Sequence, residues 1–364
     1  MANTFGKLDH LTVKGYKSIQ SVDRLPLGDI NIIIGANGAG KSNFVSLFRL
    51  LSRLAREELQ DYVVKQGGLD RLLFFGPKVS DHLEIGLEAA SVLYRAVLVP
   101  TAHQALMFDG EWINEGQQWR EIGGRGRTET GLIDKRLPRS SRTGRMRIIR
   151  NWMLDWRVYH FHDTSDFSPL RASAPLTEPE RLAADGGNLP AFLYYLQEQH
   201  PDRLEMLLDT VRLVAPFFGG FVLRPEALNK DLIRLRWRHQ GRDNLFDVAD
   251  LSDGTLRFIA LAALLLQPEP PETIVLDEPE LGLHPAAVTQ LAALMQQVSA
   301  EVQIIAATQS PTFANHFGWQ DFIVVDRVDD ASRFRRLTAE EVAPWADEFG
   351  MGEAWEKNLI GGRP

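Results

Sequence analysis

The chain has 364 residues, of which 44% are hydrophobic and 24% are charged, an ordinary composition for a globular protein. No apolar run reaches the roughly 18 residues that a membrane helix needs, and the N-terminus lacks the apolar segment of a signal peptide. We therefore expect a cytoplasmic protein without a membrane segment. Cysteine is absent, which excludes disulfides and cysteine-based metal sites. The formal charge of −8 argues against a uniformly basic coat, although it says nothing about local patches.

A phosphate-binding motif follows an early apolar segment. Residues 30–34 read INIII, a β-branched run that suits a buried parallel strand, and GANGAGKS and a helical pattern come next. This order of strand, glycine loop and helix is the context of a P-loop, whose backbone N–H groups bind phosphate. Lys41 would bridge the β- and γ-phosphates of ATP, and the Ser42 hydroxyl would bind Mg²⁺. The predicted nucleotide-binding residues of this motif are Asn37, Gly38, Gly40, Lys41, Ser42 and Asn43.

A second acidic cluster lies far along the chain, where residues 273–280 read TIVLDEPE. A strand that ends in Asp277 would place this carboxylate beside the metal, as a Walker B aspartate does. Glu278 would then polarise the attacking water as general base. An isolated pair of acidic residues after an apolar run usually marks a solvated strand end. The presence of a P-loop in the same chain favours the catalytic interpretation.

The segment LSDGTLRFIALAALLL begins at Leu251 and precedes the acidic cluster. It resembles the LSGGQ signature of ABC-type ATPases at three positions and departs from it at Asp253 and Thr255. Ser252 would cap the following helix, and Gly254 would allow a phosphate to approach the backbone. An ordinary capped helix is the alternative. The order P-loop, signature, Walker B favours a nucleotide contact from Ser252 and Gly254, made to the nucleotide of a second subunit.

Further phrases resemble one branch of the ABC-type ATPases. The opening LDHLTVKGYKS is similar to the first strand of SMC, RecF and related repair ATPases, and ELGLHP resembles the D-loop of the family. GKSNF, DEPELGLHP and ATQSP resemble stand-alone ATPases near RecF and the OLD-type enzymes. The resemblance implies an α/β ABC-type P-loop ATPase head that holds ATP and Mg²⁺ between two copies of the chain, as a homodimer or a larger assembly.

Two glutamines are assigned by this resemblance. Gln309 stands where the family has its switch histidine, and it can hydrogen-bond a γ-phosphate but cannot carry a proton as imidazole does. We therefore expect slow hydrolysis. Gln66, in KQGGLD, is the candidate Q-loop residue that contacts the γ-phosphate and the metal. A simple turn is the equal alternative for that segment.

Three regions are expected along the chain. Residues 1–118 would form an N-terminal lobe with the P-loop and an antiparallel β-subdomain, in which residues 83–99 and 104–113 alternate and Asp109-Gly110 forms a turn. Residues 119–247 would hold a basic loop and a compact helical insertion, interrupted by Pro201. Residues 248–364 would form the C-terminal lobe with signature, Walker B and switch. Because no sustained heptads occur, we expect no long coiled coil.

The segment 120–150 is rich in basic residues. A surplus of seven positive charges in an acidic protein is typical of a surface for duplex DNA or for an acidic partner. A solvated loop is the alternative. Its ten cations are Arg120, Arg125, Arg127, Lys135, Arg136, Arg139, Arg142, Arg145, Arg147 and Arg150.

The segment VYHFHDTSDFSP places His160, His162 and Asp163 close together. Alternation would put both histidines on one face of a strand. Three such residues without a distant partner make a poor metal site. We therefore favour a structural edge strand and expect no transition metal.

The sequence thus predicts an ATPase that dimerises on ATP and couples nucleotide state to DNA repair or antiphage defence. We see no nuclease constellation after residue 310, so we expect an effector protein as partner. One alternative is a nucleotide-gated scaffold that restrains a toxin or nuclease without touching DNA. A second, less favoured alternative is the ATPase subunit of a transporter, against which the KGYKS opening and the imperfect signature argue.

Overall fold

A computed structural model describes residues 7–89, 92–115, 118–133, 144–165, 167–177, 179–346 and 348–363. They fall into two compact units. Unit 1 comprises residues 1–158, 272–277 and 302–364, and unit 2 comprises residues 159–271 and 278–301. Each unit is assembled from segments that are separate in the sequence. The division into three consecutive regions expected from the sequence therefore stays a prediction.

Unit 1 contains two six-stranded sheets. The first sheet has the order β2-β1-β4-β5-β6-β7 and is antiparallel throughout. Its strands are β1 (His10–Tyr16), β2 (Ile19–Pro26), β4 (Leu83–Ala89), β5 (Val92–Pro100), β6 (Leu106–Glu115) and β7 (Gln118–Glu121). This sheet is the antiparallel β-subdomain expected from the sequence.

The expected turn at Asp109-Gly110 is wrong. Both residues lie inside β6, where Val97 pairs with Gly110 and Leu98 pairs with Phe108, so that Asp109 is an extra residue in a β-bulge. Gly110 is required there because the Trp112 ring occupies the space of a side chain. An Asp-Gly pair has the same freedom in a bulge as in a turn, which explains the error.

The second sheet carries the nucleotide motifs and has the order β17-β16-β3-β15-β14-β8. Strands β16, β3, β15 and β14 are parallel, and β17 is antiparallel to β16. The strands are β3 (Ile30–Gly35), β8 (Arg157–Tyr159), β14 (Thr273–Asp277), β15 (Gln303–Ala307), β16 (Phe322–Val328) and β17 (Ala331–Arg336). All residues of β3 and β15 are buried, as the INIII run predicts for β3.

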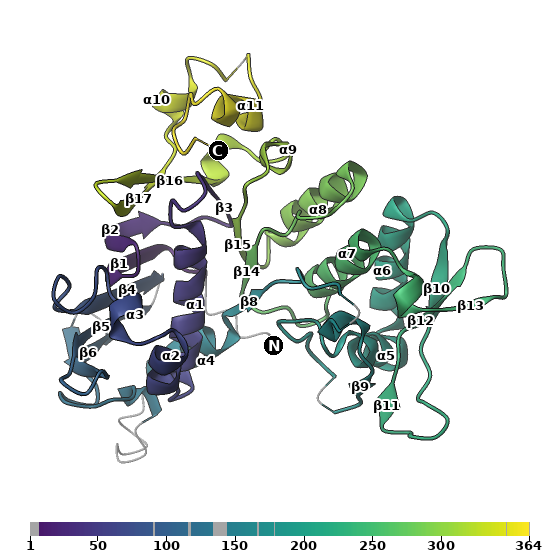
Figure 1. Cartoon of the computed structure of the whole chain (residues 1–364), viewed down its shortest axis with the longest axis horizontal. Helices are drawn as coiled ribbons and strands as arrows, with labels where there is room; N and C mark the ends of the chain where they lie inside the picture. The colour runs from purple at the N-terminus through teal and green to yellow at the C-terminus, as the bar shows by residue number, and fades with distance from the viewer. Residues whose placement is uncertain are drawn as a thin grey trace. The chain divides into compact units, whose positions relative to one another are not determined.

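Helix α1 (Lys41–Ala55) lies between these two sheets in unit 1 (Figure 1). Its buried side chains, Phe44 and Leu47 among them, belong to one apolar cluster with Val13 of β1 and Ile33 of β3. The core of unit 1 therefore packs around the helix that the P-loop begins. The other helices of unit 1 are α2 (Leu59–Lys65), α3 (Leu69–Leu72), α4 (Gly144–Asp155), α9 (Pro311–Ala314), α10 (Ala339–Val342) and α11 (Met351–Glu356).

The described residues of unit 2 form four α-helices and several short strands. Its helices are α5 (Leu189–Gln199), α6 (Pro201–Val214), α7 (Asp253–Leu265) and α8 (Pro285–Val298). The short strands are β9 (Ala174–Pro175), β10 (Phe218–Val222), β11 (Leu232–Ile233), β12 (Arg236–His239) and β13 (Leu245–Asp247). Pro201 separates α5 from α6 at the first position of the second helix, as expected.

The longest helix of the described residues, α1, has 15 residues, so that no long coiled coil occurs among them. None of the helices described has the length and apolar character needed to cross a membrane.

Candidate nucleotide site

The P-loop has the local structure that its sequence predicts. A short loop, residues 36–40, joins β3 to α1. Gly40, at the end of this loop, has a φ of 118°, which only glycine adopts readily. A side chain at Gly40 would also collide with the hydroxyl of Ser332. Asn37 and Gly38 are exposed in the loop, and Ser42 is exposed in the first turn of α1.

Lys41 folds back onto its own loop. The side chain is 5% exposed, and its Nζ donates to the carbonyl oxygens of Gly35 at 2.6 Å and Ala36 at 3.1 Å. A buried ammonium group needs such oxygen partners. Phosphate oxygens can replace these carbonyls, so the residues present fit a nucleotide phosphate.

Three strand ends meet at the edge of the sheet where the P-loop lies. Strand β15 pairs in parallel with β3 on one side and with β14 on the other, and Ala307 is opposite both Ile33 and Asp277. The residues after each strand therefore share one edge. They are the P-loop after β3, Gln309 after β15 and Asp277 at the end of β14, and Gln309 is exposed there.

The residue after Asp277 has an unusual backbone. Glu278 has a φ of 47°, in the left-handed region that a residue with a Cβ seldom adopts. Its carbonyl accepts a hydrogen bond from Leu281 N, which closes a turn. Strain of this kind gathers at functional sites, because the surrounding structure must stabilise it.

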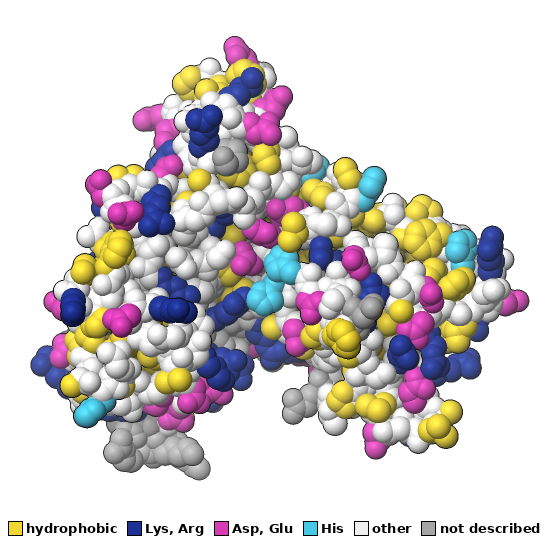
Figure 2. Space-filling model, in the orientation of Figure 1, with side chains coloured by type: hydrophobic (Ala, Val, Ile, Leu, Met, Phe, Trp, Pro, Cys, Tyr) yellow, Lys and Arg dark blue, Asp and Glu magenta, His cyan; other side chains and the backbone are white. Residues whose placement is uncertain are grey.

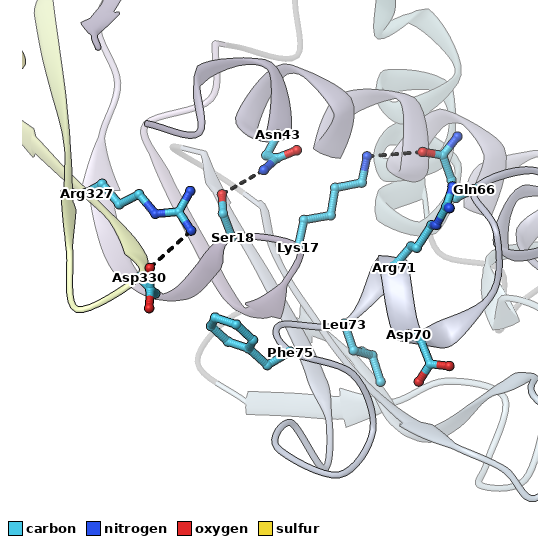
Figure 3. A pocket seen from close by; sticks show the side chains of 10 residues that line it. All are labelled: Lys17, Ser18, Asn43, Gln66, Asp70, Arg71, Leu73, Phe75, Arg327 and Asp330. Carbon is cyan, nitrogen blue, oxygen red and sulfur yellow. Dashed lines mark hydrogen bonds and ion pairs between the residues drawn. The ribbon is translucent and has the colours of Figure 1, made fainter. Parts of the chain in front are cut away.

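An open pocket of about 480 Å³ adjoins the P-loop (Figure 3). Ser18 and Asn43 form one part of its wall, with Asn43 Nδ2 donating to Ser18 Oγ at 2.7 Å. Arg327, on another part, donates to the carbonyl of Gly38 in the P-loop at 3.4 Å. Phe75 presents a side chain that is 59% exposed. The full lining is Lys17, Ser18, Asn43, Gln66, Asp70, Arg71, Leu73, Phe75, Arg327 and Asp330.

Gln66 lies in this pocket and contacts Lys17. The Lys17 Nζ donates to Gln66 Oε1 at 3.1 Å (Figure 3). It also donates to Ser46 Oγ at 3.0 Å. Burial, helped by the charge of Arg49, lowers the pKa of Lys17 to about 8. Lys17 is therefore largely protonated at neutral pH. The predicted contact of Gln66 with metal stays a prediction.

The signature segment begins α7. Ser252 is its N-cap, and Ser252 Oγ accepts from Thr255 N at 3.2 Å, as the sequence predicts. Gly254 packs against the D-loop, because a Cβ there would lie 2.9 Å from the carbonyl oxygen of Gly282. Contact of Ser252 and Gly254 with a nucleotide stays a prediction.

Sequence reasoning missed Arg257, which is buried in α7. Its guanidinium donates to the backbone carbonyls of Phe161 at 2.8 Å, His162 at 3.0 Å and Leu281. Burial lowers the pKa of Arg257 below its ordinary value. One cation thus joins the signature helix, the D-loop and the segment after β8. The available signal was an arginine inside an otherwise apolar helix, since such residues are rarely buried without partners.

The remaining predicted positions have mixed outcomes. Strand β8 is at the edge of its sheet but ends at Tyr159, so His160 and His162 lie beyond it, with ring centroids 5.9 Å apart. The described residues contain no group of three His, Asp or Glu side chains that could hold a metal ion.

In the basic segment, Arg127 and Arg145 have structural contacts, with the carbonyls of Thr130 and Asn114. Arg147 lies exposed on α4, not in a loop. Lys135, Arg136, Arg139 and Arg142 lie outside the described residues.

One protein-family model matches most of the chain. Residues 30–315 match the family described as "AAA domain, putative AbiEii toxin, Type IV TA system". The chain belongs to this AAA-domain family. The match begins at β3 and extends past Gln309, so that it includes the P-loop, the signature segment, Asp277 and Glu278. No curated protein matches the sequence.

Solved structures show the same fold. The head of an SMC protein bound to the C-terminal winged-helix domain of ScpA has a TM-score of 0.61 and 16% identity, over 93% of this chain and 99% of that one. An SMC head with an extended coiled coil, bound to the C-terminal domain of ScpA from Pyrococcus furiosus, also has a TM-score of 0.61, with 15% identity over 94% and 99% of the two chains. The AAA domain described here therefore has the ABC-type head fold of SMC proteins.

We predict that Arg257→Ala destabilises unit 2, because the carbonyls of Phe161, His162 and Leu281 lose their shared donor. A loss of about 3 kcal/mol is expected for such a group. Chemical denaturation with a fluorescence readout measures it. Arg242→Ala removes an exposed arginine of the same unit and is the matched control. Equal stability of both variants would show that these bonds contribute nothing.

Proposed function

We propose that this AAA domain is an ATPase that binds ATP and Mg²⁺ between two copies of the chain, and that ATP binding closes the dimer. The observation that carries the proposal is the parallel register of β3, β15 and β14, which gathers the P-loop, Gln309 and Asp277 at one edge. A nucleotide-binding P-loop needs a carboxylate near its metal, and Asp277 ends β14, which only β15 separates from β3.

Each residue has a role in this proposal. Lys41 exchanges its two loop carbonyls for phosphate oxygens, and Asn37, Gly38, Gly40 and Asn43 surround the same phosphates. Ser42 and Asp277 hold Mg²⁺, which neutralises phosphate charge. The roles predicted for Gln66, Gln309, Ser252 and Gly254 are part of the proposal.

The pocket beside the P-loop receives the nucleoside. Its volume of about 480 Å³ is in the range of small-ligand pockets. The exposed ring of Phe75 offers a surface for a base, and Lys17 offers positive charge at neutral pH.

The wider task we propose is DNA-related work in repair or antiphage defence, with control of a separate effector protein. An SMC head of the same fold was solved with a bound ScpA domain, which supports a protein partner for this head too. A cytoplasmic location agrees with this task. The alternative is a nucleotide-gated scaffold that restrains its effector without DNA.

We predict that Glu278→Gln keeps ATP binding, stops turnover and accumulates the dimer. The amide preserves shape and hydrogen bonding but cannot accept the proton of the attacking water. Single-turnover hydrolysis and analytical ultracentrifugation measure the two effects. Glu301→Gln alters an exposed carboxylate outside every nucleotide motif and is the control. Turnover within a few-fold of wild type would assign the base to another residue.

A mixture of two inactive variants tests the shared site. Lys41→Ala removes the P-loop cation, and Ser252→Arg blocks the signature. A mixed dimer retains one composite site with both motifs intact, so we expect partial recovery of ATPase activity on mixing. Each variant alone should remain without ATPase activity. Absence of recovery, with both variants folded by circular dichroism, contradicts the two-copy site.

DNA binding separates the two wider proposals. Figure 2 shows Lys and Arg side chains in separate groups, interspersed with acidic ones, on the face in view. If the basic segment binds duplex DNA, affinity should fall with salt with a slope of roughly −4, as four or five phosphate contacts imply.

We predict that changing Arg125, Arg139, Arg142 and Arg147 together to Ser flattens this slope and leaves ATPase activity intact. These positions avoid Arg127 and Arg145, whose contacts are structural. Fluorescence anisotropy with a DNA duplex at several salt concentrations measures the slope. If the wild-type chain does not bind the DNA duplex at low salt, the result favours the nucleotide-gated scaffold instead.

A further inference from the structure

Arg171, like Arg257, is an arginine of unit 2 that contacts the signature segment, and it binds at the start of helix α7. It ends the short turn Pro169–Arg171, and its side chain is only 9% exposed. The guanidinium donates to the carbonyl oxygens of Thr164 at 2.9 Å, Val248 at 2.8 Å and Leu251 at 3.3 Å. The bonds to Val248 and Leu251 hold the backbone just before α7.

The same guanidinium pairs with the first residue of α7. Arg171 Nη2 lies 2.7 Å from Asp253 Oδ1, and the Asp253 side chain is 63% exposed. Asp253 is one of the two positions at which the segment departs from the LSGGQ pattern, where glycine carries no charge. The largely buried guanidinium of Arg171 therefore pairs with the exposed carboxylate of Asp253, by which this helix start differs from the LSGGQ pattern.

A carboxylate at this position has two opposed effects. It stabilises the free helix, because negative charge interacts favourably with a helix N-terminus. The same charge repels any phosphate that approaches the first turn. A counterion that is already held in place by three carbonyls offsets this repulsion without ordering a mobile side chain.

We propose that Arg171 is a positioning residue that allows the first turn of α7 to accept the terminal phosphate of a nucleotide held by a second copy, by neutralising Asp253. This inference rests on the two-copy site of the proposed function. Arg171 lies far from the nucleotide motifs in sequence. Its positive charge explains how Asp253, which departs from the LSGGQ pattern, remains compatible with a bound phosphate.

A purely structural role is the competing explanation, since Arg171 also holds three carbonyls. The two explanations differ in one respect. If charge compensation matters, removal of the Asp253 charge restores dimerisation to an Arg171 variant. If only the carbonyl bonds matter, removal of that charge restores nothing.

The experiment is a double-mutant cycle in the Glu278→Gln background, with ATP-dependent dimerisation followed by analytical ultracentrifugation. We expect Arg171→Gln to weaken the dimer about tenfold and Asp253→Asn to strengthen it about threefold, the scale of partly exposed charge interactions. The double variant should return to within about threefold of the parent. Arg212→Gln, which alters an arginine paired with Asp209 and the carbonyl of Gly219, is the matched control and should change nothing.

Several outcomes would overturn the inference. A double variant as weak as Arg171→Gln shows that the carbonyl bonds alone matter. The Asp253 side chain is exposed, so the Asp253→Asn variant should fold whether or not an Arg171 variant does. An unchanged or weaker dimer in the Asp253→Asn variant therefore also overturns the inference. A parent that binds ATP but forms no dimer contradicts the proposed function itself, and the inference with it.

Discussion

The position of β15 between β3 and β14 is the constraint on which the nucleotide site depends. Both pairings are parallel, and Ala307 is the common register point. A shift by one residue on either side would turn the buried side chains of that strand to the other face of the sheet. Both faces of β3 and β15 are packed, so such a shift would set every side chain against neighbours of a different shape. The register in turn sets the separation of the P-loop from Asp277.

A second constraint acts on the loop itself. Ser332 of β17 is fully buried, and its hydroxyl donates to the carbonyl of Ala39 and contacts the hydroxyl of Ser18. Asn43 donates to the same Ser18 hydroxyl. The two sheets of unit 1 thus meet at the P-loop through hydroxyl groups, and Gly40 is the residue that leaves room for them.

The sequence predicted those parts of the molecule in which local pattern and tertiary structure agree. The P-loop flanks, the Ser252 cap and the break at Pro201 each depend on a few neighbouring residues. The Asp109-Gly110 turn failed because glycine freedom serves a bulge and a turn equally, and only the pairing of β5 with β6 decides. The strand expected at His160 and His162 ends at Tyr159, and the backbone N–H of His160 donates to the carbonyl of Ala184 instead, a contact that no local pattern predicts.

The contacts of Arg171 and Arg257 could not be assigned from pattern, because most of their partners are backbone carbonyls, which have no signature in sequence. Their use has a physical reason. Most of α7 is apolar and packs within unit 2, which holds the body of the helix. Its first turn, with Ser252 and Asp253 exposed, cannot be fixed by apolar burial if it is to meet a phosphate. Arg171 instead holds the carbonyls of Val248 and Leu251 just before that turn, and Arg257 ties the next turn of the helix to Phe161 and His162. Ser252 and Asp253 remain exposed.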